Sequence, residues 1–334
     1  MNLVIPMAGR GTRLRPHTLT TPKPLVPIAG KPIVERLVND IASVCNEKIN
    51  DIAFIIGDFG KEVEESLLQI ADQLGAKGHI VYQEQALGTA HAVYCAKELL
   101  DGNVIVAFAD TLFRASFQLD TASDGIIWVK QVEDPSAFGV VKMDDNKVIT
   151  DFVEKPKEFV SDLAIIGIYY FKHGEKLRAE LQKLIDNKIM SGGEYQLTVA
   201  LENLKSDGVK FVPGQVDDWL DCGNKKATVE TNRTYLGYLE EQELTGKDVV
   251  IKDSTIIPPV YLGDGVTIER SVVGPHVSVG SGTSIASSVV EDSIVGADTV
   301  ISNAVFSGSM IGQYVKLNGK IADYSVGDYN QIEG

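Results

Sequence analysis

An apolar residue returns at every fifth or sixth position near the end of the chain, from Val250 through Ile268 and Ile285 to Leu317. An ordinary sandwich of short strands would instead show polar and apolar residues alternating with a period of two, so the longer period favours hexapeptide solenoid repeats. Glycine directly follows several of these apolar residues, as expected where a chain turns a corner with little room: Gly263, Gly274, Gly280, Gly296 and Gly312. With three short strands per coil, we predict about four coils.

Residues 2 to about 220 show a different sequence pattern, in which short apolar runs alternate with amphipathic segments. We predict strands at residues 4–7, 52–56, 79–83 and 104–108, and helices from Pro32 onward, at 61–74 and at 89–100. This order predicts an α/β domain with a Rossmann-like, mostly parallel sheet that is flanked by helices. Ligands of such a sheet bind at the carboxyl ends of its strands.

The middle of the chain carries apolar runs with few helices between them, at residues 126–132, 139–143, 148–154 and 164–171. We expect these runs to form an antiparallel extension that walls one side of the site. Helices at about 175–187, 194–205 and 224–242 would close the first domain. Residues 245–248 are the expected linker, which predicts a catalytic domain at 1–244 and a repeat domain at 245–334.

The composition excludes several classes of protein. A formal net charge of −15 disfavours binding to nucleic acid and to anionic membranes, because neutralising phosphates requires a basic surface. The longest apolar stretches are far shorter than the roughly 20 residues that span a bilayer. Cys45, Cys95 and Cys222 are widely spaced, which indicates neither a disulfide framework nor a zinc site. We therefore expect a cytoplasmic protein.

One stretch departs from this acidity, because residues 1–34 contain no Asp or Glu although the chain has 46 of them. The cations of the stretch surround glycines just after the first predicted strand: Arg10, Arg13, Arg15, Lys23 and Lys31. The pattern is neither a Walker A loop nor the dinucleotide fingerprint. Small residues would let backbone N–H groups approach a triphosphate while the cations converge on it, so we predict a phosphate site here.

The segment from Gly9 to Pro24, GRGTRLRPHTLTTPKP, resembles the motif of the sugar nucleotidyltransferases, approximately G-x-G-T-R-x-x-P-x-T-x-x-x-P-K-P. The resemblance implies that Arg13 stabilises the departing pyrophosphate and that Lys23 bridges the α-phosphate. It also implies that part of the loop binds the nucleotide: Ala8, Gly9, Gly11 and Thr12. A solvated surface role is equally open for Arg10 and Arg15. The likeness is strongest to the longer glucose-1-phosphate thymidylyltransferases, which implies the nucleotide-diphospho-sugar transferase fold followed by a left-handed β-helix.

A second motif, QEQALGTA from Gln83 to Ala90, lies between a predicted strand and a predicted helix. By resemblance it receives the nucleobase, with Gln83 reading the base edge, Gly88 leaving room for the ring and Thr89 beside it. An amide offers both a donor and an acceptor, which suits uracil or thymine. We read the histidines, His91 and His276 among them, as structural or solvated.

Asp110 follows the apolar run 104–109, and Asp221 lies in the segment WLDCG. Either residue alone would more often cap a turn. Two carboxylates from separate loops are nevertheless what Mg²⁺ bound to substrate phosphates requires. The resemblance implies that both aspartates hold this metal, so Mg²⁺ is the expected cofactor.

The resemblance places the sugar 1-phosphate beside Gly139, Glu154, Lys155 and Glu194. Gly139 would pack under the sugar, the two glutamates would accept hydrogen bonds from it or orient it, and Lys155 would hold its phosphate as a catalytic cation. The reaction needs no side-chain nucleophile, because a phosphate oxygen of the sugar 1-phosphate is already an anion that can attack the α-phosphorus.

The expected reaction joins glucose 1-phosphate to dTTP, with UTP as the next candidate. The family usually has Leu-Ala or Ala-Ala where this chain has Pro6 and Met7, which leaves UTP, CTP and GTP open. A non-catalytic regulatory subunit of the family is the alternative, but it would be expected to lose Arg13, Lys23 or Asp221. Hexapeptide coils also build acyltransferases. Here we expect the coils to serve assembly, as part of a homo-oligomer.

Overall fold

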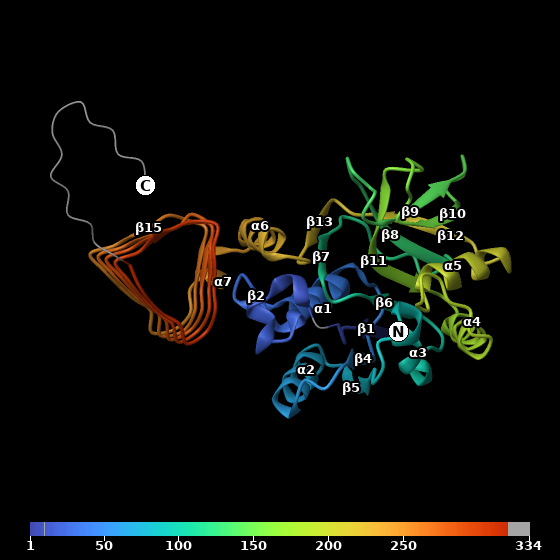
Figure 1. The fold of residues 1–334 in the computed structure, drawn as a ribbon, viewed down its shortest axis with the longest axis horizontal. Coiled ribbons are helices and arrows are strands. Elements are labelled where there is room, and N and C mark those ends of the chain that lie inside the picture. The colour runs from blue at the N-terminus through green and yellow to red at the C-terminus, as the bar shows by residue number, and fades with distance from the viewer. Residues whose placement is uncertain (10, 320–334) are drawn as a thin grey trace. The chain divides into compact units, whose positions relative to one another are not determined.

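A computed structural model describes residues 1–9 and 11–319, so Arg10 lies outside the described residues. The chain divides into two compact units (Figure 1). The first comprises Met1–Pro27 and Lys31–Asn224, and the second comprises Ile28–Gly30 and the chain from Lys225 onward. The boundary between the units therefore falls after Asn224, earlier than the linker expected at 245–248, because the helical segment at 225–244 groups with the coils.

The parallel half of the main sheet is built as predicted. Its strands lie in the order β6 (Val104–Ala107), β1 (Asn2–Pro6), β4 (Asp51–Ile56) and β5 (Lys77–Tyr82), and each neighbouring pair is parallel. The three inner strands β1, β4 and β6 are apolar and mostly buried, as expected where helices cover both faces of a sheet, whereas β5 at the edge is more polar and more exposed. The connecting helices are α1 (Ile33–Val44), α2 (Lys61–Gln73) and α3 (Thr89–Cys95), and a 3₁₀ turn at Lys97–Leu99 completes the predicted segment.

The predicted antiparallel extension is also present. Strand β11 (Leu163–Phe171) runs antiparallel to β6 and joins it to β8 (Gly125–Gln131) and β9 (Gly139–Met143). Strand β10 (Ile149–Glu154) pairs with β9 at the outer edge of the sheet, and β12 (Phe211–Gln215) pairs with β8. Helices α4 (Gly174–Asp186) and α5 (Leu197–Ser206) complete this half.

A two-stranded ladder outside the main sheet was not predicted. It joins β7 (Thr111–Arg114) to β13 (Asp218–Asp221) in antiparallel register, with Asp221 opposite Thr111. Short elements follow β1, namely 3₁₀ turns at Thr12–Leu14, His17–Leu19 and Lys23–Leu25 and the paired strands β2 (Pro27–Ile28) and β3 (Lys31–Pro32). None of the described helices has both the length and the apolar character that crossing a membrane would take.

The second unit is a β-helix, as the repeat predicts. It begins with α6 (Lys225–Leu236) and α7 (Glu241–Leu244). Its strands are β14 (Val250–Lys252), β15 (Thr255–Ile256), β16 (Val260–Leu262), β17 (Thr267–Glu269), β18 (Val272–Val273), β19 (Val277–Val279), β20 (Ser284–Ala286), β21 (Val289–Val290), β22 (Ile294–Val295), β23 (Val300–Ser302), β24 (Val305–Phe306), β25 (Met310–Ile311) and β26 (Lys316–Asn318). Every third strand pairs in parallel, which gives three sheets around a triangular core (Figure 1).

The apolar residues that define the repeat stack inside the coils. Ile268, Ile285 and Ile301 occupy matching positions in successive coils, and all three are fully buried. Buried Asn232 on α6 links residues 28–30 to the β-helix. Its Oδ1 accepts hydrogen bonds from the backbone N–H of Ala29 (2.9 Å) and from Ser278 Oγ (2.7 Å). These bonds explain why residues 28–30 belong to this unit.

Candidate active site

A cavity of about 400 Å³ opens where β1, β5 and β6 end. Its position agrees with the rule that parallel sheets bind ligands at the carboxyl ends of their strands. Its lining includes most of the residues that the sequence predicts for the nucleotide and for catalysis: Ala8, Gly9, Gly11, Thr12, Arg13, Lys23, Gln83, Gly88, Thr89, Asp110 and Glu194. Motifs far apart in the sequence therefore share one cavity.

The basic side of the cavity is formed by the loop that follows β1. Gly11 has a φ of 58°, and a Cβ there would lie 2.9 Å from Lys23 Cβ, so a glycine lets the loop fold back on the Lys23 turn. The hydroxyl of Thr18 fastens the fold by donating to the Gly11 carbonyl at 2.7 Å. Lys23 is only 8% exposed, whereas Arg13 is exposed at the rim. Lys23 thus gives the cavity a buried cation and Arg13 an accessible one.

The β7–β13 ladder brings Asp110, which directly precedes β7, near Asp221, which ends β13. Cys222 donates its backbone N–H to the Asp110 carbonyl at 3.0 Å, and Trp219 Nε1 donates to Thr111 Oγ1 at 2.8 Å. Lys23 Nζ forms an ion pair with Asp110 Oδ2 at 3.1 Å. Asp221 Oδ1 in turn accepts the backbone N–H of Gly223 at 2.8 Å.

The electrostatics show that these charges act on one another. Burial raises the pKa of Asp221, and the charge of Asp110 raises it further, whereas the Gly223 N–H, Lys23 and Arg13 lower it. Two carboxylates of which one resists ionisation fit a divalent cation, since a cation would relieve both the burial and the repulsion. No cluster of three or more His, Cys, Asp or Glu side chains suited to a metal occurs in the described chain. The remaining ligands would have to come from phosphate and water.

The loop at residues 83–90, called the base loop because the sequence predicts that it receives the nucleobase, is bonded to the segment that carries Glu194. Tyr195 exchanges two backbone hydrogen bonds with this loop, donating to Leu87 O (2.8 Å) and accepting from Ala90 N (2.9 Å). Leu197 N also donates to Thr89 Oγ1 at 3.0 Å. A Cβ on Gly88 would lie 2.4 Å from the Tyr195 carbonyl, and its φ is 113°. Glycine is therefore required at this position because the Tyr195 backbone lies so close, and the sequence alone does not reveal that contact.

The other amino acids that are predicted to bind the sugar 1-phosphate lie together at one end of the β9–β10 pair. Gly139 faces Glu154 across the ladder, and Lys155 donates its N–H to Phe138 O at 3.1 Å. Lys155 has a φ of 42°, which is uncommon outside glycine. These residues are not among the described lining of the cavity. Glu154 and Asp110 nevertheless both raise the pKa of Tyr169, after burial as the main cause, so both carboxylates lie within electrostatic reach of one phenol.

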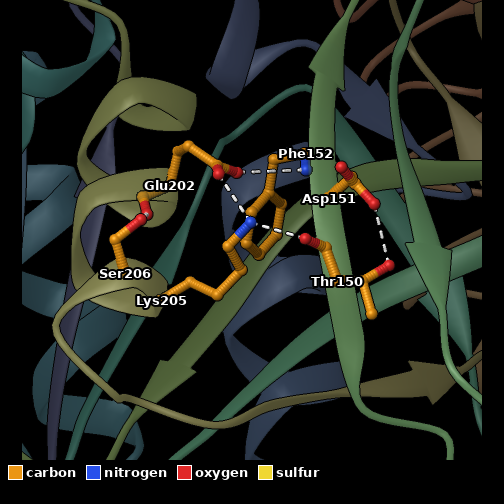
Figure 2. Close-up of polar contacts among 6 residues, drawn as sticks. All are labelled: Thr150, Asp151, Phe152, Glu202, Lys205 and Ser206. Carbon is orange, nitrogen blue, oxygen red and sulfur yellow. Dashed lines mark hydrogen bonds and ion pairs between the residues drawn. The ribbon is translucent and has the colours of Figure 1, made fainter.

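Side chains of α5 hold the outer edge of β10 (Figure 2). Glu202 Oε2 accepts the backbone N–H of Phe152 at 3.4 Å, and Lys205 Nζ donates to the Thr150 carbonyl and pairs with Glu202. An edge strand otherwise presents unpaired backbone groups. These contacts fix β10, which ends at Glu154, against the helix that follows Glu194. The sequence gives no motif for them.

Comparisons with known proteins identify relatives of this chain. The model of the family described as "Nucleotidyl transferase" matches residues 3–237. A glucose-1-phosphate thymidylyltransferase of Streptomyces antibioticus is 30% identical over 100% of this chain and 99% of its own length. The low-salt glycan biosynthesis nucleotidyltransferase Agl11 of Haloferax volcanii is 31% identical over 77% of this chain and 71% of its length. The bifunctional protein GlmU of Methanococcus maripaludis is 32% identical over 78% of this chain, which spans only 62% of that relative.

Solved structures share the fold at lower identity. A nucleoside-diphosphate-sugar pyrophosphorylase of Vibrio cholerae has a TM-score of 0.60 and 22% identity, and covers 69% of this chain with 99% of its own. A UDP-glucose pyrophosphorylase complexed with UDP-glucose has a TM-score of 0.59 and 24% identity over 71% of this chain and 99% of its own. With the family model covering more than half of the chain, these findings show that the protein belongs to the nucleotidyl transferase family.

Proposed function

We propose that this protein joins a sugar 1-phosphate to a nucleoside triphosphate, releasing pyrophosphate and forming a nucleotide sugar. Glucose 1-phosphate and dTTP are the favoured pair, and UTP is the next candidate. The observation that carries the proposal is the ion pair between buried Lys23 and half-exposed Asp110, which lies in a cavity that Gly9, Gly11 and the base loop also line. The thymidylyltransferase of Streptomyces antibioticus, which aligns with the whole chain, supports the favoured pair.

In the proposed reaction an oxygen of the sugar phosphate attacks the α-phosphorus of the triphosphate. The new O–P bond forms as the bond from the α-phosphorus to the bridging oxygen breaks, and the electron pair leaves with pyrophosphate. Both substrates are anions, so catalysis consists of holding them in line and offsetting their charge. Lys23 would move from Asp110 to the α-phosphate, and Arg13 at the rim would bind the departing pyrophosphate. Lys155 would hold the phosphate of the sugar.

The carboxylates of Asp110 and Asp221 would hold Mg²⁺, which supplies charge neutralisation and Lewis acidity to the phosphates when bound. Glu154 and Glu194, joined through β10 and α5, would orient the sugar above Gly139. Arg13, Lys23 and Asp221 are all retained, which speaks against a non-catalytic regulatory subunit. A cytoplasmic location, and assembly of copies through the β-helix, remain parts of the proposal.

A pyrophosphate-release assay tests this function. Purified protein would be supplied with each of dTTP, UTP, CTP, GTP and ATP in combination with a panel of sugar 1-phosphates, with Mg²⁺ or with excess chelator. We expect release only when a nucleotide, a sugar 1-phosphate and the metal are all present, and fastest with dTTP or UTP and glucose 1-phosphate. Absence of release with every pair would refute the proposal.

A further inference from the structure

The side-chain amide of Gln83 is held by two partners on its nitrogen. Nε2 lies 3.2 Å from the carbonyl oxygen of Gly88 and 3.2 Å from Nδ1 of His91, on the first turn of α3. A carbonyl oxygen can only accept, so the contact with Gly88 identifies the nitrogen end of the amide. His91 therefore faces an N–H donor, and its Nδ1 must be the unprotonated acceptor of a neutral ring. Burial lowers the pKa of His91, which favours this neutral form.

Only the oxygen of the amide is then left for a ligand. The amide nitrogen carries two hydrogens, and Gly88 and His91 occupy both. Gln83 lines the cavity, whereas His91 is not among its described lining residues, so His91 acts on the amide without reaching the ligand itself. The site presents a single acceptor, Gln83 Oε1, instead of the donor and acceptor that a free amide offers.

The edges of the pyrimidine bases differ at the matching position. Uracil and thymine carry N3–H, which donates, whereas N3 of cytosine carries a lone pair, which repels another acceptor. If the Gln83 amide could rotate by half a turn, it would serve both kinds of base, because its nitrogen could then donate to cytosine N3. Guanine also carries a ring N–H, so this arrangement would separate dTTP and UTP from CTP but not from GTP.

We propose that His91 determines base specificity: it locks the Gln83 amide with Oε1 toward the base, and so selects uracil and thymine over cytosine. This inference rests on the proposed nucleotidyl transfer and names the chemical class of base that the site accepts. His91 is a positioning residue, because it acts through Gln83.

The test compares kcat/KM for dTTP, UTP and CTP, with glucose 1-phosphate and Mg²⁺, across four proteins. His91→Leu removes the acceptor at similar volume, and His91→Asn keeps one, since Asn Oδ1 can take the place of Nδ1. His173→Leu is the matched control, because His173 is an exposed histidine of the same unit whose side chain pairs with Glu175. We expect His91→Leu to lower the preference for dTTP or UTP over CTP by about 10-fold to 100-fold. His91→Asn and His173→Leu should keep the wild-type preference.

An unchanged preference in folded His91→Leu, or an equal loss with all nucleotides, would overturn the inference. A second measurement needs no variant: N3-methyl-UTP, which lacks the N3–H, should be a far poorer substrate than UTP for the wild-type protein, and equal use of both would overturn the inference as well. A wild-type protein that prefers CTP would refute the role of His91 while leaving nucleotidyl transfer intact. Absence of turnover with every nucleotide would instead refute the proposed function.

Discussion

Replacing Lys23 with methionine should remove catalysis while leaving the fold in place. Methionine keeps the apolar stem of this side chain, which is 90% buried, and deletes only the ammonium group. Two opposite unit charges about 4 Å apart interact by about 4 kcal/mol at an effective dielectric constant of about 20. If Lys23 neutralises the α-phosphate in the transition state, its loss should lower kcat/KM by about 10³-fold, since about 1.4 kcal/mol corresponds to a factor of ten.

The stability cost should be small, because Asp110 is 46% exposed and can be hydrated once its partner is gone. An ion pair with so exposed a member contributes at most about 1 kcal/mol, which would shift Tm by about 2–4 °C in a domain of this size. Lys31→Met is the control: Lys31 belongs to the same acid-free stretch, but it is half-exposed and pairs with Glu35 at 2.9 Å.

The assay is pyrophosphate release at varied nucleotide concentration, with Tm measured on the same samples. Lys31→Met should stay within about threefold of wild type, as expected for a surface substitution. A Lys23→Met protein that folds and keeps kcat/KM within the same margin would show that the α-phosphate is not neutralised by this residue.

Three further substitutions test other parts of the site. In Asp221→Asn, activity should fall, but Tm without metal should rise at neutral pH: the folded-state pKa of Asp221 is raised, so its ionised form costs stability, and the gain should vanish as pH falls into the range where the wild-type carboxyl is protonated. Thermal unfolding at several pH values, with chelator present, checks this, and a lower Tm at neutral pH would contradict it. Gly88→Ala should lower the free energy of unfolding by about 1–3 kcal/mol in a urea titration, because the new Cβ meets the Tyr195 carbonyl at 2.4 Å in a left-handed backbone conformation. Lys205→Met should raise KM for the sugar 1-phosphate severalfold and leave KM for the nucleotide unchanged, since Lys205 holds the strand that ends at Glu154; equal changes in both would argue against this positioning role.

The sequence predicts most of this fold because most of its elements carry a local period. The coils follow from one apolar residue per side, and the parallel strands follow from buried runs such as Val104–Ala107. The β7–β13 ladder has no such signal. Its strands are four residues long and lie about a hundred positions apart, and pairing across that separation depends on the rest of the fold. The sequence therefore identifies Asp110 and Asp221 only through the family motif.

The sequence predicts by residue type most of the side chains that line the cavity, but it does not predict their orientation. Gln83 follows from its motif, yet the sequence alone leaves both ends of its amide available to a base. His91 was read as structural or solvated, because a lone histidine has no partner that sequence spacing can reveal. Helix α5 begins at Leu197 and not at 194, which leaves Tyr195 outside the helix with its backbone bonded to the base loop. Such contacts join segments that are distant along the chain, and no periodic pattern records them.

Hydrogen bonds join the 87–90 loop to residues 195 and 197, so the two proposed substrate subsites share one set of bonds. If the substrates bind as proposed, a base that shifts the loop would also shift Glu194, and a sugar that moves Glu194 would also move the loop. Thermodynamic linkage makes such coupling mutual, so each substrate would change the affinity for the other by the same factor. The two substrates would then bind cooperatively, without a subunit interface or a separate effector site.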